Sequence, residues 1–522
     1  RGSKAGDGPP RHPRRQQFQQ EQTASQPSPS RTIGADVSFM SELRVSELDN
    51  LIAPESSRAL TEVFGFERLT QIQAQVIPVA LNGSDVFGKA KTGQGKTIAF
   101  LIPTIEALLR SAQRERDGVR SIIISPTREL AMQIYHEAKD MLKYHHKFRI
   151  GTALGGTNRK MDERMLSGGV DVLVATPGRL LDHIENTQGF QDQIRNVRVL
   201  TLDEADTLLD MGFELDMKKI VSKLPTSRQT LMFSATSPPS LESVCKQWMR
   251  PGFAIVNTVK EGESSTNIQV KQEVLRVTLE NHLQTLASAL STSMKQPDFK
   301  IIVFFTTARV VGYYADIFRK MKLPVLEMHS RLTQSRRTKT AAEFRNSKNK
   351  IMFTSDVSAR GVDYPDVTMV IQLGMVEKAT YVHRLGRTGR IGKEGRGLLL
   401  LHNFEDRFTL NNMKELPIQK CSLELDRGLD QKLENALGSM RDPRADSNAA
   451  KAQAQAYQAW LGFYNGHKKK LGWNNDDLVR HANNFAHSIG ASTPPPIKKV
   501  TAAKMGLISK GKSGRPAGLN IV

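Results

Sequence analysis

The octet AKTGQGKT at residues 90–97 has the composition of a phosphate-binding loop. It follows a short apolar run that ends in VFG at 86–88 and precedes the apolar stretch IAFLI at 98–102, which predicts a strand, a loop and a helix. Small residues let backbone N–H groups close around an anion, and a helix N-terminus adds partial positive charge. Lys96 can reach the β and γ phosphates, and the Thr97 hydroxyl can hold Mg²⁺. On the octet alone, a Gly/Thr turn before a buried helix remains the alternative interpretation.

The acidic tetrad Asp-Glu-Ala-Asp at 203–206 supplies a second set of groups for phosphate chemistry. It directly follows an apolar run at 197–202, so it is expected at the end of a strand. An aspartate there can hold Mg²⁺, and a neighbouring glutamate can orient or deprotonate an attacking water. An acidic turn is commonplace by itself. After a phosphate loop and at a strand end, it indicates nucleotide hydrolysis.

The stretch HRLGRTGR at 383–390 carries three arginines that can neutralise charge on a γ-phosphate. An arginine finger accelerates hydrolysis by roughly 10³–10⁵, which corresponds to about 4–7 kcal/mol. If these arginines belong to a second domain, the catalytic site is complete only when two domains close. A basic surface loop that binds nothing is the alternative.

The elements that must position these groups follow an alternating pattern. Short β-branched runs alternate with helical stretches, and each run ends in polar, Gly or Pro residues, which predicts a parallel sheet buried on both faces with ligands at the strands' carboxyl ends. Besides 86–88, strands are expected at 122–124, 170–174, 197–202 and 230–233, and then at 300–305, 351–353, 367–373 and 398–401. A polar linker separates the two sets. The second set lacks a phosphate loop, so it is expected to be a partner domain and not a second ATPase.

The C-terminal part is helical and basic, with Tyr457, Trp460 and Tyr464 at i, i+3 and i+7 beside three lysines at 468–470. One interpretation is an aromatic and basic platform for single-stranded nucleic acid. The other, which we favour, is an apolar helix face docked on the second domain with solvated lysines. The N-terminal arm is rich in Gln, Pro, Ser and Arg, and we expect it and the last residues to be disordered.

The charge balance points to a polyanionic partner. The 522 residues include 74 Lys and Arg against 53 Asp and Glu, a formal net charge of +21, and nucleic acid is the usual partner of such a surplus. A membrane surface is the competing partner, but no 18-residue apolar run exists. Only two cysteines, Cys245 and Cys421, are present, which argues for a reducing compartment and against a disulfide framework or a Cys-based zinc site. We expect an intracellular protein, with mitochondrion, other organelle and nucleus left open.

With these motifs in this order, the chain resembles the DEAD-box ATP-dependent RNA helicases of superfamily 2. The resemblance covers residues 45–421, and its motifs stand at 65–73, 90–97, 126–130, 155–156, 176–179, 203–206, 234–236, 354–363 and 383–390. The Ala-rich tail with Tyr457 and Trp460 is similar to a plant and fungal subgroup that includes organellar members.

The resemblance implies two RecA-like parallel-sheet α/β domains in tandem. The expected boundaries are a disordered basic arm at 1–44, a first domain at 45–256, a linker at 257–267, a second domain at 268–425, a helical extension at 426–490 and a disordered basic tail at 491–522. It also implies RNA-stimulated ATP hydrolysis coupled to local duplex unwinding or remodelling of RNA–protein complexes. An ATP-gated RNA clamp or RNA chaperone is the alternative, and a DNA helicase is a third. ATP and Mg²⁺ are the implied cofactors. RNA is the implied partner, bound mostly through its backbone by a monomer without membrane contact, and protein partners stay open.

The family's functional residues can be carried over by position. The implied nucleotide-binding residues are Phe66, Thr70, Gln73, Gly93, Gln94, Gly95, Lys96, Thr97 and, at the ribose, Asp363. Thr97 and Asp203 are implied for Mg²⁺, and Glu204 (as general base), Lys96, Arg387 and Arg390 for catalysis. Ser234, Ala235 and Thr236 are implied to couple hydrolysis to strand separation. The implied RNA-facing residues are Pro126, Thr127, Arg128, Gly156, Thr176, Gly178 and Arg179 in the first domain, and His329, Gln334, Arg337 and Thr354 in the second.

The chain departs from the family pattern near the adenine. Leu69 stands where the family usually has proline, and Leu48 stands where it usually has an aromatic residue. Adenine packing is therefore expected to be weaker than phosphate binding. Ser358 and Leu385 are milder departures that should be tolerated.

Overall fold

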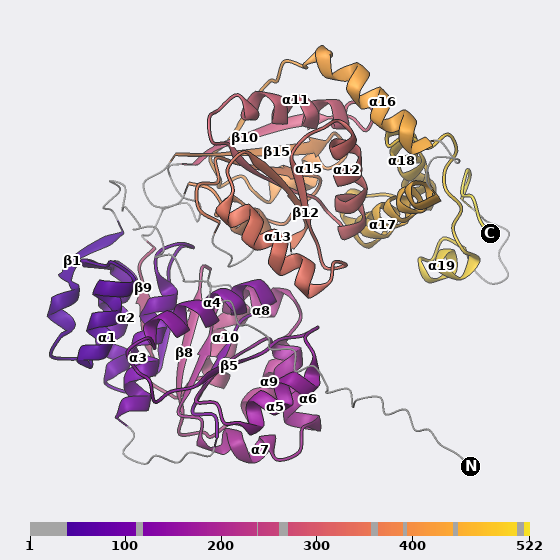
Figure 1. The fold of residues 1–522 in the computed structure, drawn as a ribbon. Coiled ribbons are helices and arrows are strands. Elements are labelled where there is room, and N and C mark those ends of the chain that lie inside the picture. The colour runs from indigo at the N-terminus through magenta and orange to yellow at the C-terminus, as the bar shows by residue number, and fades with distance from the viewer. Residues whose placement is uncertain are drawn as a thin grey trace, which may run out of the picture. The chain divides into compact units, whose positions relative to one another are not determined.

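The computed structural model describes residues 39–110, 118–236, 239–259, 270–356, 364–389, 394–441, 447–508 and 516–522. In this part of the chain, two seven-stranded sheets follow one another in sequence, and every pairing within each sheet is parallel. Figure 1 shows helices on both faces of each sheet. The predicted tandem α/β fold is confirmed.

The first half comprises residues 39–259. Its strands are β1 (Met40–Arg44), β2 (Arg68–Thr70), β3 (Val86–Lys89), β4 (Ser121–Ile124), β5 (Ile150–Ala153), β6 (Val172–Ala175), β7 (Val199–Leu202), β8 (Gln229–Ser234) and β9 (Ala254–Asn257). Its helices are α1 (Pro54–Arg58), α2 (Gln71–Leu81), α3 (Lys96–Leu109), α4 (Arg128–Met141), α5 (Arg159–Ser167), α6 (Pro177–Asn186), α7 (Phe190–Gln193), α8 (Ala205–Asp210), α9 (Glu214–Ser222) and α10 (Pro239–Trp248), with short helical turns at Val45–Leu48, Ala59–Val63 and Ile194–Asn196.

Alternation along the central strands divides the first half into two cores. In β4, Ile123 packs in the core that contains residues of α2, α3 and α4, whereas Ile122 and Ile124 pack in the core that contains residues of α6, α9 and α10. Side chains alternate across a strand, so a continuous apolar run serves both faces. The strand order β5-β6-β4-β7-β8-β3-β9 brings the ends of β3, β4, β6, β7 and β8 to one edge.

The second half repeats this topology. Its elements are β10 (Val270–Val277), α11 (His282–Met294), β11 (Lys300–Phe304), α12 (Ala308–Lys320), β12 (Val325–Met328), α13 (Gln334–Asn346), β13 (Lys350–Thr354), β14 (Met369–Leu373), α14 (Lys378–Leu385), β15 (Gly395–His402), α15 (Asp406–Asn411) and β16 (Ile418–Lys420). The order β12-β13-β11-β14-β15-β10-β16 places the strands in the same sequence ranks as in the first sheet. The two halves therefore share one fold.

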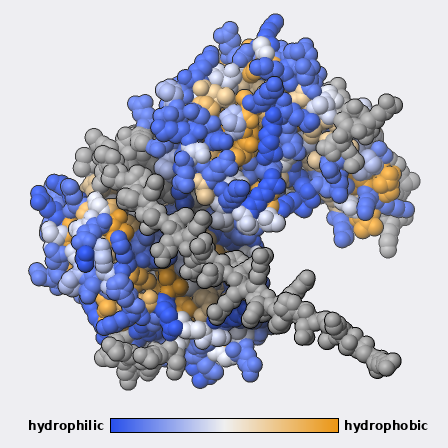
Figure 2. All heavy atoms as spheres, viewed as in Figure 1, coloured by the Kyte–Doolittle hydropathy of each residue, from blue (hydrophilic) through white to orange (hydrophobic). Residues whose placement is uncertain are grey.

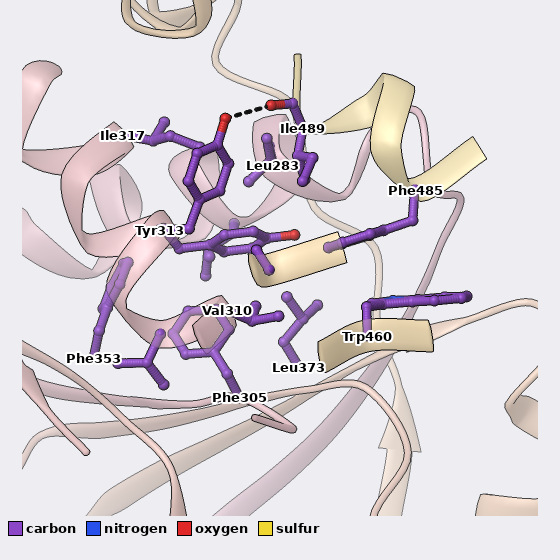
Figure 3. Packing of buried hydrophobic residues seen from close by; sticks show 14 of the residues in the cluster. Leu283, Phe305, Val310, Tyr313, Ile317, Phe353, Leu373, Trp460, Phe485 and Ile489 are labelled. Atoms are coloured by element: carbon purple, nitrogen blue, oxygen red, sulfur yellow. Dashed lines mark hydrogen bonds between the residues drawn. The ribbon is translucent and has the colours of Figure 1, made fainter. Parts of the chain in front are cut away.

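A helical extension completes the second half's largest core. It consists of a turn at Arg427–Leu429 and of α16 (Asp430–Arg441), α17 (Ser447–Leu471), α18 (Asn475–Ser488) and α19 (Lys499–Lys504). Figure 3 shows Trp460 of α17 and Phe485 of α18 beside Leu373 and Val310, and their rings stack at 5.1 Å. The Tyr313 hydroxyl of α12 donates a hydrogen bond of 2.7 Å to the Ile489 carbonyl. The extension thus belongs to the second domain's core.

The structure corrects several sequence-based boundaries. Met40–Arg44, expected in the disordered arm, forms β1 and pairs with β2, while residues 1–38 lie outside the described part. Asn257, expected in the linker, closes the first sheet as the last residue of β9, opposite Lys89. Linker residues 260–267 lie outside the described part.

The tail at 491–522 was expected to be disordered, and this prediction is wrong for its described residues. Ile497, Leu507 and Leu519 are buried in the same core as Trp460, and Ile497 forms a β-bridge with Ile521. Apolar residues scattered among Pro and Lys carry no local signal of burial. Residues 509–515 are not described.

Five strands of the two large sheets, β5, β9, β10, β12 and β16, were not predicted from the sequence. Of these, β5, β9 and β12 are edge strands and include half-buried or exposed residues, whereas the central strands β4, β6 and β7 are buried throughout. Hydrophilic residues cover most of the face seen in Figure 2. No helix among the residues placed by the structure has the length and apolar character needed to span a membrane.

Candidate nucleotide and RNA site

The predicted phosphate-binding octet connects β3 to α3, as its composition requires. Gly93 and Gly95 have φ values of +83° and +82°, a conformation that glycine adopts without strain. Gly95 is the N-cap of α3 and provides no side chain, so the first-turn N–H groups have no side-chain cap. Lys96 is buried, and its ammonium donates a hydrogen bond of 3.1 Å to the Ala90 carbonyl. The loop presents backbone donors and one cation together.

The residues expected to read the adenine are joined to this loop. The Gln73 amide donates a 3.1 Å hydrogen bond to the Gly95 carbonyl, and its oxygen accepts one of 2.9 Å from the Thr70 N–H. Thr70 caps α2, since its hydroxyl accepts from the Gln73 N–H at 3.4 Å. Phe66 is half-buried and stacks on Phe64, with ring centroids 5.5 Å apart.

The two residues that depart from the family pattern at this end of the site are both in the core. Leu48 and Leu69 are 4% and 1% exposed. They pack in the same core cluster as Phe64 and Phe66. Leu69 lies within β2, which pairs with β1, so the turn before α2 is held by a sheet contact.

Asp203 and Glu204 lie immediately after β7, and both are buried. Glu204 has φ +49°, an uncommon value for a residue other than glycine, and its N–H donates to the Asp203 carboxylate at 3.0 Å. Burial and then the Glu204 charge raise the pKa of Asp203 to about 7, against the opposing effect of Lys96. The Glu204 Oε2 atom is buried without a hydrogen-bond partner among the described residues. The negative charge of two adjacent carboxylates is only partly balanced by the one positive charge of Lys96. This fits a site that receives a divalent cation together with a nucleotide.

The Ser-Ala-Thr segment at the end of β8 contacts both the tetrad and the loop. Asp206 accepts hydrogen bonds from the Thr236 N–H at 3.0 Å and from its hydroxyl at 2.8 Å, and Thr236 N–H also donates to the Ser234 hydroxyl at 3.3 Å. The Ser234 carbonyl accepts from the Ala90 N–H at 3.2 Å. Ala235 between them is half-buried. Burial alone would raise the pKa of Asp206, but His383, Lys96 and the hydroxyls hold it below its ordinary value.

Two helix N-termini carry all of the predicted RNA-facing residues of the first half except Gly156, which lies between β5 and α5. Thr127 caps α4, and Pro126 before it is buried at the end of β4. The Arg128 guanidinium lies against Gly156, where a Cβ would come within 2.3 Å of it. At α6, the Thr176 hydroxyl accepts from the Gly155 N–H at 3.1 Å, and exposed Gly178 faces open space. These turns and their N–H groups can receive phosphates.

Arg179 differs from its neighbours because protein groups occupy its guanidinium. It pairs with the buried carboxylate of Asp162 and donates to the Thr157 hydroxyl at 3.2 Å and to the Thr157 carbonyl at 3.0 Å. No local pattern in the chain indicates this pairing, since Asp162 precedes Arg179 by a whole strand.

In the second half, the predicted RNA-facing residues lie after β12 and at the end of β13. His329 is buried, and burial, then Arg309, Arg336, Arg331 and Arg337, lower its pKa to about 4. Its Nδ1 accepts from the Arg331 N–H at 3.3 Å. Gln334 begins α13, and Thr354 ends β13, where its hydroxyl donates to the Ser355 carbonyl. Sequence reasoning missed Arg309, Arg331 and Arg336 as members of this basic cluster, although the latter two follow His329 closely.

The arginine motif occupies α14 and the turn after it. Arg384 pairs with Asp356 at 2.6 Å and lies over the Phe304 ring at 5.2 Å, so it is committed to structure. Arg387 is 1% exposed and donates to the His383 carbonyl at 3.3 Å. Asp363, Ser358 and Arg390 lie outside the described residues.

Residues of the predicted motifs also meet across the two halves. Arg337 pairs with Glu129 at 2.6 Å, and Arg128 donates to the Gln334 side chain at 3.3 Å. His383 Nε2 lies 3.7 Å from the Asp206 carboxylate. The arginine motif and the acidic tetrad are therefore in contact through His383 and Asp206.

Comparison with known proteins identifies the same two units. The DEAD/DEAH box helicase family model matches residues 70–244, and the helicase conserved C-terminal domain model matches residues 281–392. DEAD-box ATP-dependent RNA helicase 26 of Oryza sativa subsp. japonica is 44% identical over 474 residues, which are 90% of this chain and 86% of the rice protein. DEAD-box ATP-dependent RNA helicase 31 of Arabidopsis thaliana is also 44% identical, over 91% of this chain and 66% of the relative. Among solved structures, Mss116p bound to ssRNA and AMP-PNP superposes with a TM-score of 0.78 at 27% identity, over 91% of this chain and 96% of that one.

Proposed function

Because this chain belongs to the DEAD-box ATP-dependent RNA helicases, we propose that its phosphate loop, its acidic tetrad and Arg387, just after α14, form the site where ATP hydrolysis drives RNA remodelling. The observation that carries the residue assignments is the contact set at one sheet edge. There Lys96, Glu204 and the Ser-Ala-Thr segment lie together, and the RNA-facing turns after β4 and β6 end at the same edge.

ATP is held mainly by the first half. Residues 93–97 bind the phosphates through backbone N–H groups and the Lys96 ammonium. Gln73 keeps one amide N–H for the adenine, since a glutamine has two and Gly95 takes the other. Phe66 and Thr70 flank the base, and Asp363 is assigned to the ribose from the family pattern.

Mg²⁺ is proposed on Thr97 and Asp203, because the buried Asp203–Glu204 pair needs more positive charge than Lys96 provides. When bound, the ion neutralises charge on the phosphates. Glu204 then acts as the general base: its Oε2 has no partner in the described part of the chain and is available to orient a water and accept its proton. Arg387, with Arg390 assigned from the family pattern, stabilises the charge that spreads over the transferred phosphoryl group.

RNA is proposed to bind as a backbone across both halves. The N-termini of α4 and α6 and Arg128 supply phosphate contacts in the first half, and Gln334, Thr354 and the basic cluster around His329 supply them in the second. The solved structure of Mss116p, similar over most of its length, contains single-stranded RNA and a nucleotide analogue together. Phosphate and sugar contacts carry no base code, so binding is sequence-independent, with 2′-OH contacts favouring RNA.

Arg179 has a positioning role in this scheme. Its guanidinium ties Thr157 to Asp162 beneath the α6 N-terminus, so it shapes the RNA-facing turn from below. Thr236 and Ser234 transmit the state of the phosphate loop to Asp206, whose other neighbour is His383 of the second half.

The test is Glu204→Gln, which keeps the side-chain shape and removes the base. RNA-stimulated kcat is expected to fall by about 10²–10⁴, with ATP and RNA affinities retained. Glu214→Gln is the matched control, because Glu214 is exposed and pairs with Lys218 on its own helix. Unchanged ATP hydrolysis in Glu204→Gln would refute the assignment.

A clamp or annealing chaperone is the second candidate, favoured only by the basic ends of the chain. A duplex-release assay run beside the ATPase assay separates the two. Rapid ATP-dependent release of a short RNA duplex is the helicase outcome, and we propose that a monomer performs it.

A further inference from the structure

Glu405 is a buried carboxylate that no step of the proposed mechanism uses. It lies just after β15, is 0% exposed and accepts hydrogen bonds from three different parts of the fold. Its Oε2 accepts from the His402 N–H at 2.8 Å and lies 3.0 Å from the His402 ring. Its Oε1 accepts from the Met375 N–H at 2.7 Å and from the Tyr464 hydroxyl.

These two Oε1 donors come from segments with different roles. Tyr464 is on α17 of the C-terminal extension, where Phe404 and Trp460 pack against its ring. Burial and the Glu405 charge raise the pKa of Tyr464, so its hydroxyl stays a donor. Met375 is in the short connection between β14 and α14. The Oε1 atom of Glu405 thus connects the C-terminal extension to the segment that leads into α14.

The close approach is built into the backbone. Gly374 has φ +94°, and a Cβ there would lie 2.8 Å from Thr306 and 3.5 Å from both the Glu405 carboxylate and the Tyr464 hydroxyl. Only glycine fits this position without displacing one of them.

A second contact from α17 reaches the same segment. The Lys470 ammonium lies 2.6 Å from the carboxylate of Glu377, which is the N-cap residue of α14, and 5.0 Å from the Phe408 ring centroid. Both partners are about half exposed, so this pair is the weaker link.

Arg387 lies two residues beyond the C-terminal end of α14, in the turn that follows Leu385. The Arg387 N–H donates to the Arg384 carbonyl at 3.1 Å, and its guanidinium donates to the His383 carbonyl. A shift of the start of α14 therefore moves this arginine with the helix.

We propose that Tyr464 and Lys470 of the extension are positioning residues for ATP hydrolysis: through Glu405, Met375 and Glu377 they fix the start of α14 and so place Arg387. The inference rests on the proposed role of Arg387. It assigns to the extension an effect on the chemical step, separate from its contribution to the core.

The primary experiment compares Tyr464→Phe with Tyr457→Phe in the full chain. Both tyrosines are buried on α17, and both changes remove one hydroxyl, but Tyr457 donates to Asn483 within the extension. Tyr464→Phe is expected to lower RNA-stimulated kcat by about tenfold, since misplacements near 1 Å cost on the order of 100-fold. The KM for ATP and the RNA affinity should stay unchanged. Hydrogen exchange at residues 375–386 should accelerate in Tyr464→Phe and not in Tyr457→Phe.

The proposal is overturned if the two variants have the same kcat, or if exchange at 375–386 changes in Tyr464→Phe while kcat does not. Arg387→Ala, measured in parallel, tests the underlying assignment: an unchanged kcat there refutes the finger role itself, whatever Tyr464→Phe does.

If Tyr464→Phe fails to fold, two variants of exposed lysines provide the same test. Lys470→Glu places like charges at the α14 N-cap, and Lys469→Glu makes the same charge change one residue away. At saturating RNA, Lys470→Glu is expected to lower kcat about twofold more than Lys469→Glu. Equal values for the two variants would overturn the proposal.

Discussion

At the residue scale, the neighbours of each buried ionisable group in the site decide whether its pKa is raised or lowered. Burial and the Glu204 charge raise the pKa of Asp203, while the pKa of Asp206, three residues on, is held down by His383, Lys96 and hydroxyl donors. The two aspartates of one tetrad therefore have different electrostatic roles. His329 in the second half is kept neutral by burial and by four nearby arginines, while Glu327, 3.9 Å from its Nε2, acts in the opposite direction.

The lowered pKa of His329 predicts a pH dependence of stability. Its pKa is about 4 in the folded chain against 6.5 for an ordinary histidine, so the unfolded chain binds the proton first as pH falls. The free energy of unfolding should therefore decrease between pH 6.5 and pH 4, by up to about 1.4 kcal/mol per pH unit for this residue. Buried His282, with a pKa lowered to about 3, adds to the same slope.

His329→Asn isolates the contribution of His329, because an asparagine oxygen can still accept the Arg331 N–H. Urea unfolding at pH 7, 6 and 5 should show a shallower loss of stability in this variant than in the parent. Identical slopes would contradict a neutral, buried His329.

At the element scale, the conformation of the phosphate loop before α3 depends on two glycines, Gly93 and Gly95, in left-handed conformations. The Gln73 side chain lies so close to Gly95 that no larger residue fits there. A Cβ on Gly95 would lie 2.5 Å from the Gln73 amide nitrogen. The loop and the turn before α2 therefore form one unit, and nucleotide binding should depend on both.

Gly95→Ala is expected to abolish detectable ATP binding, because it strains the loop and displaces Gln73. Gly83→Ala is the matched control: Gly83 has nearly the same φ, +83°, but a Cβ there would meet nothing within 4 Å. The left-handed backbone should cost each variant about 1 kcal/mol in unfolding free energy, with a further cost in Gly95→Ala from the contact with Gln73, while fluorescent-nucleotide titration should show a binding loss only in Gly95→Ala. Retained affinity in Gly95→Ala would argue against the coupling of loop and turn.

The structure shows where the aromatic residues of α17 pack. Tyr457, Trp460 and Tyr464 are at most 2% exposed and pack in the second domain's core, so the docked interpretation is confirmed and the exposed aromatic platform is wrong. Truncation near residue 440 would open this core, so point variants are the appropriate probes of the extension.

Trp460→Ala should destabilise the second half by about 3–5 kcal/mol, the usual cost of emptying a buried aromatic site. The RNA affinity of the molecules that remain folded should be unchanged, because the ring has no free face to stack on a base. Lys469→Ala, on the exposed side of α17, should leave the unfolding free energy within about 0.5 kcal/mol of the parent. Weakened RNA binding by fully folded Trp460→Ala would revive the platform interpretation.

At the scale of the whole molecule, the two halves share one topology but divide the chemistry. The first half holds the phosphate loop and the acidic tetrad, and the second supplies the arginine motif and half of the proposed RNA surface. ATP and RNA should therefore bind cooperatively, because each stabilises the arrangement that the other needs.

RNA affinity is expected to depend steeply on salt. With about six phosphates neutralised, log affinity should fall with log salt at a slope near −4, using roughly −0.7 per contact for single strands. Arg336→Gln, which removes one cation of the His329 cluster, should reduce the slope by about 0.7 for every RNA sequence. Lys218→Gln is the control, because Lys218 is exposed and pairs with Glu214 on α9. A salt-independent RNA affinity would contradict backbone-dominated binding.

The sequence alone determined the chemistry and the fold class of this protein. The octet at 90–97 and the tetrad at 203–206 can be recognised from consecutive residues alone. The strand–loop–helix context of the octet and the adjacent carboxylates of the tetrad are set by neighbours in the chain. Continuous apolar runs likewise identified the central strands of both sheets. What only the tertiary structure decided depends on partners distant in sequence: the pairing of Arg179 with Asp162, the bond from Gln73 to Gly95, the burial of α17 and of Leu519, and the convergence of Tyr464 and Met375 on Glu405. The spacing of apolar residues predicts which face of a helix is apolar. It does not predict which element packs on that face, because such packing joins elements tens or hundreds of residues apart.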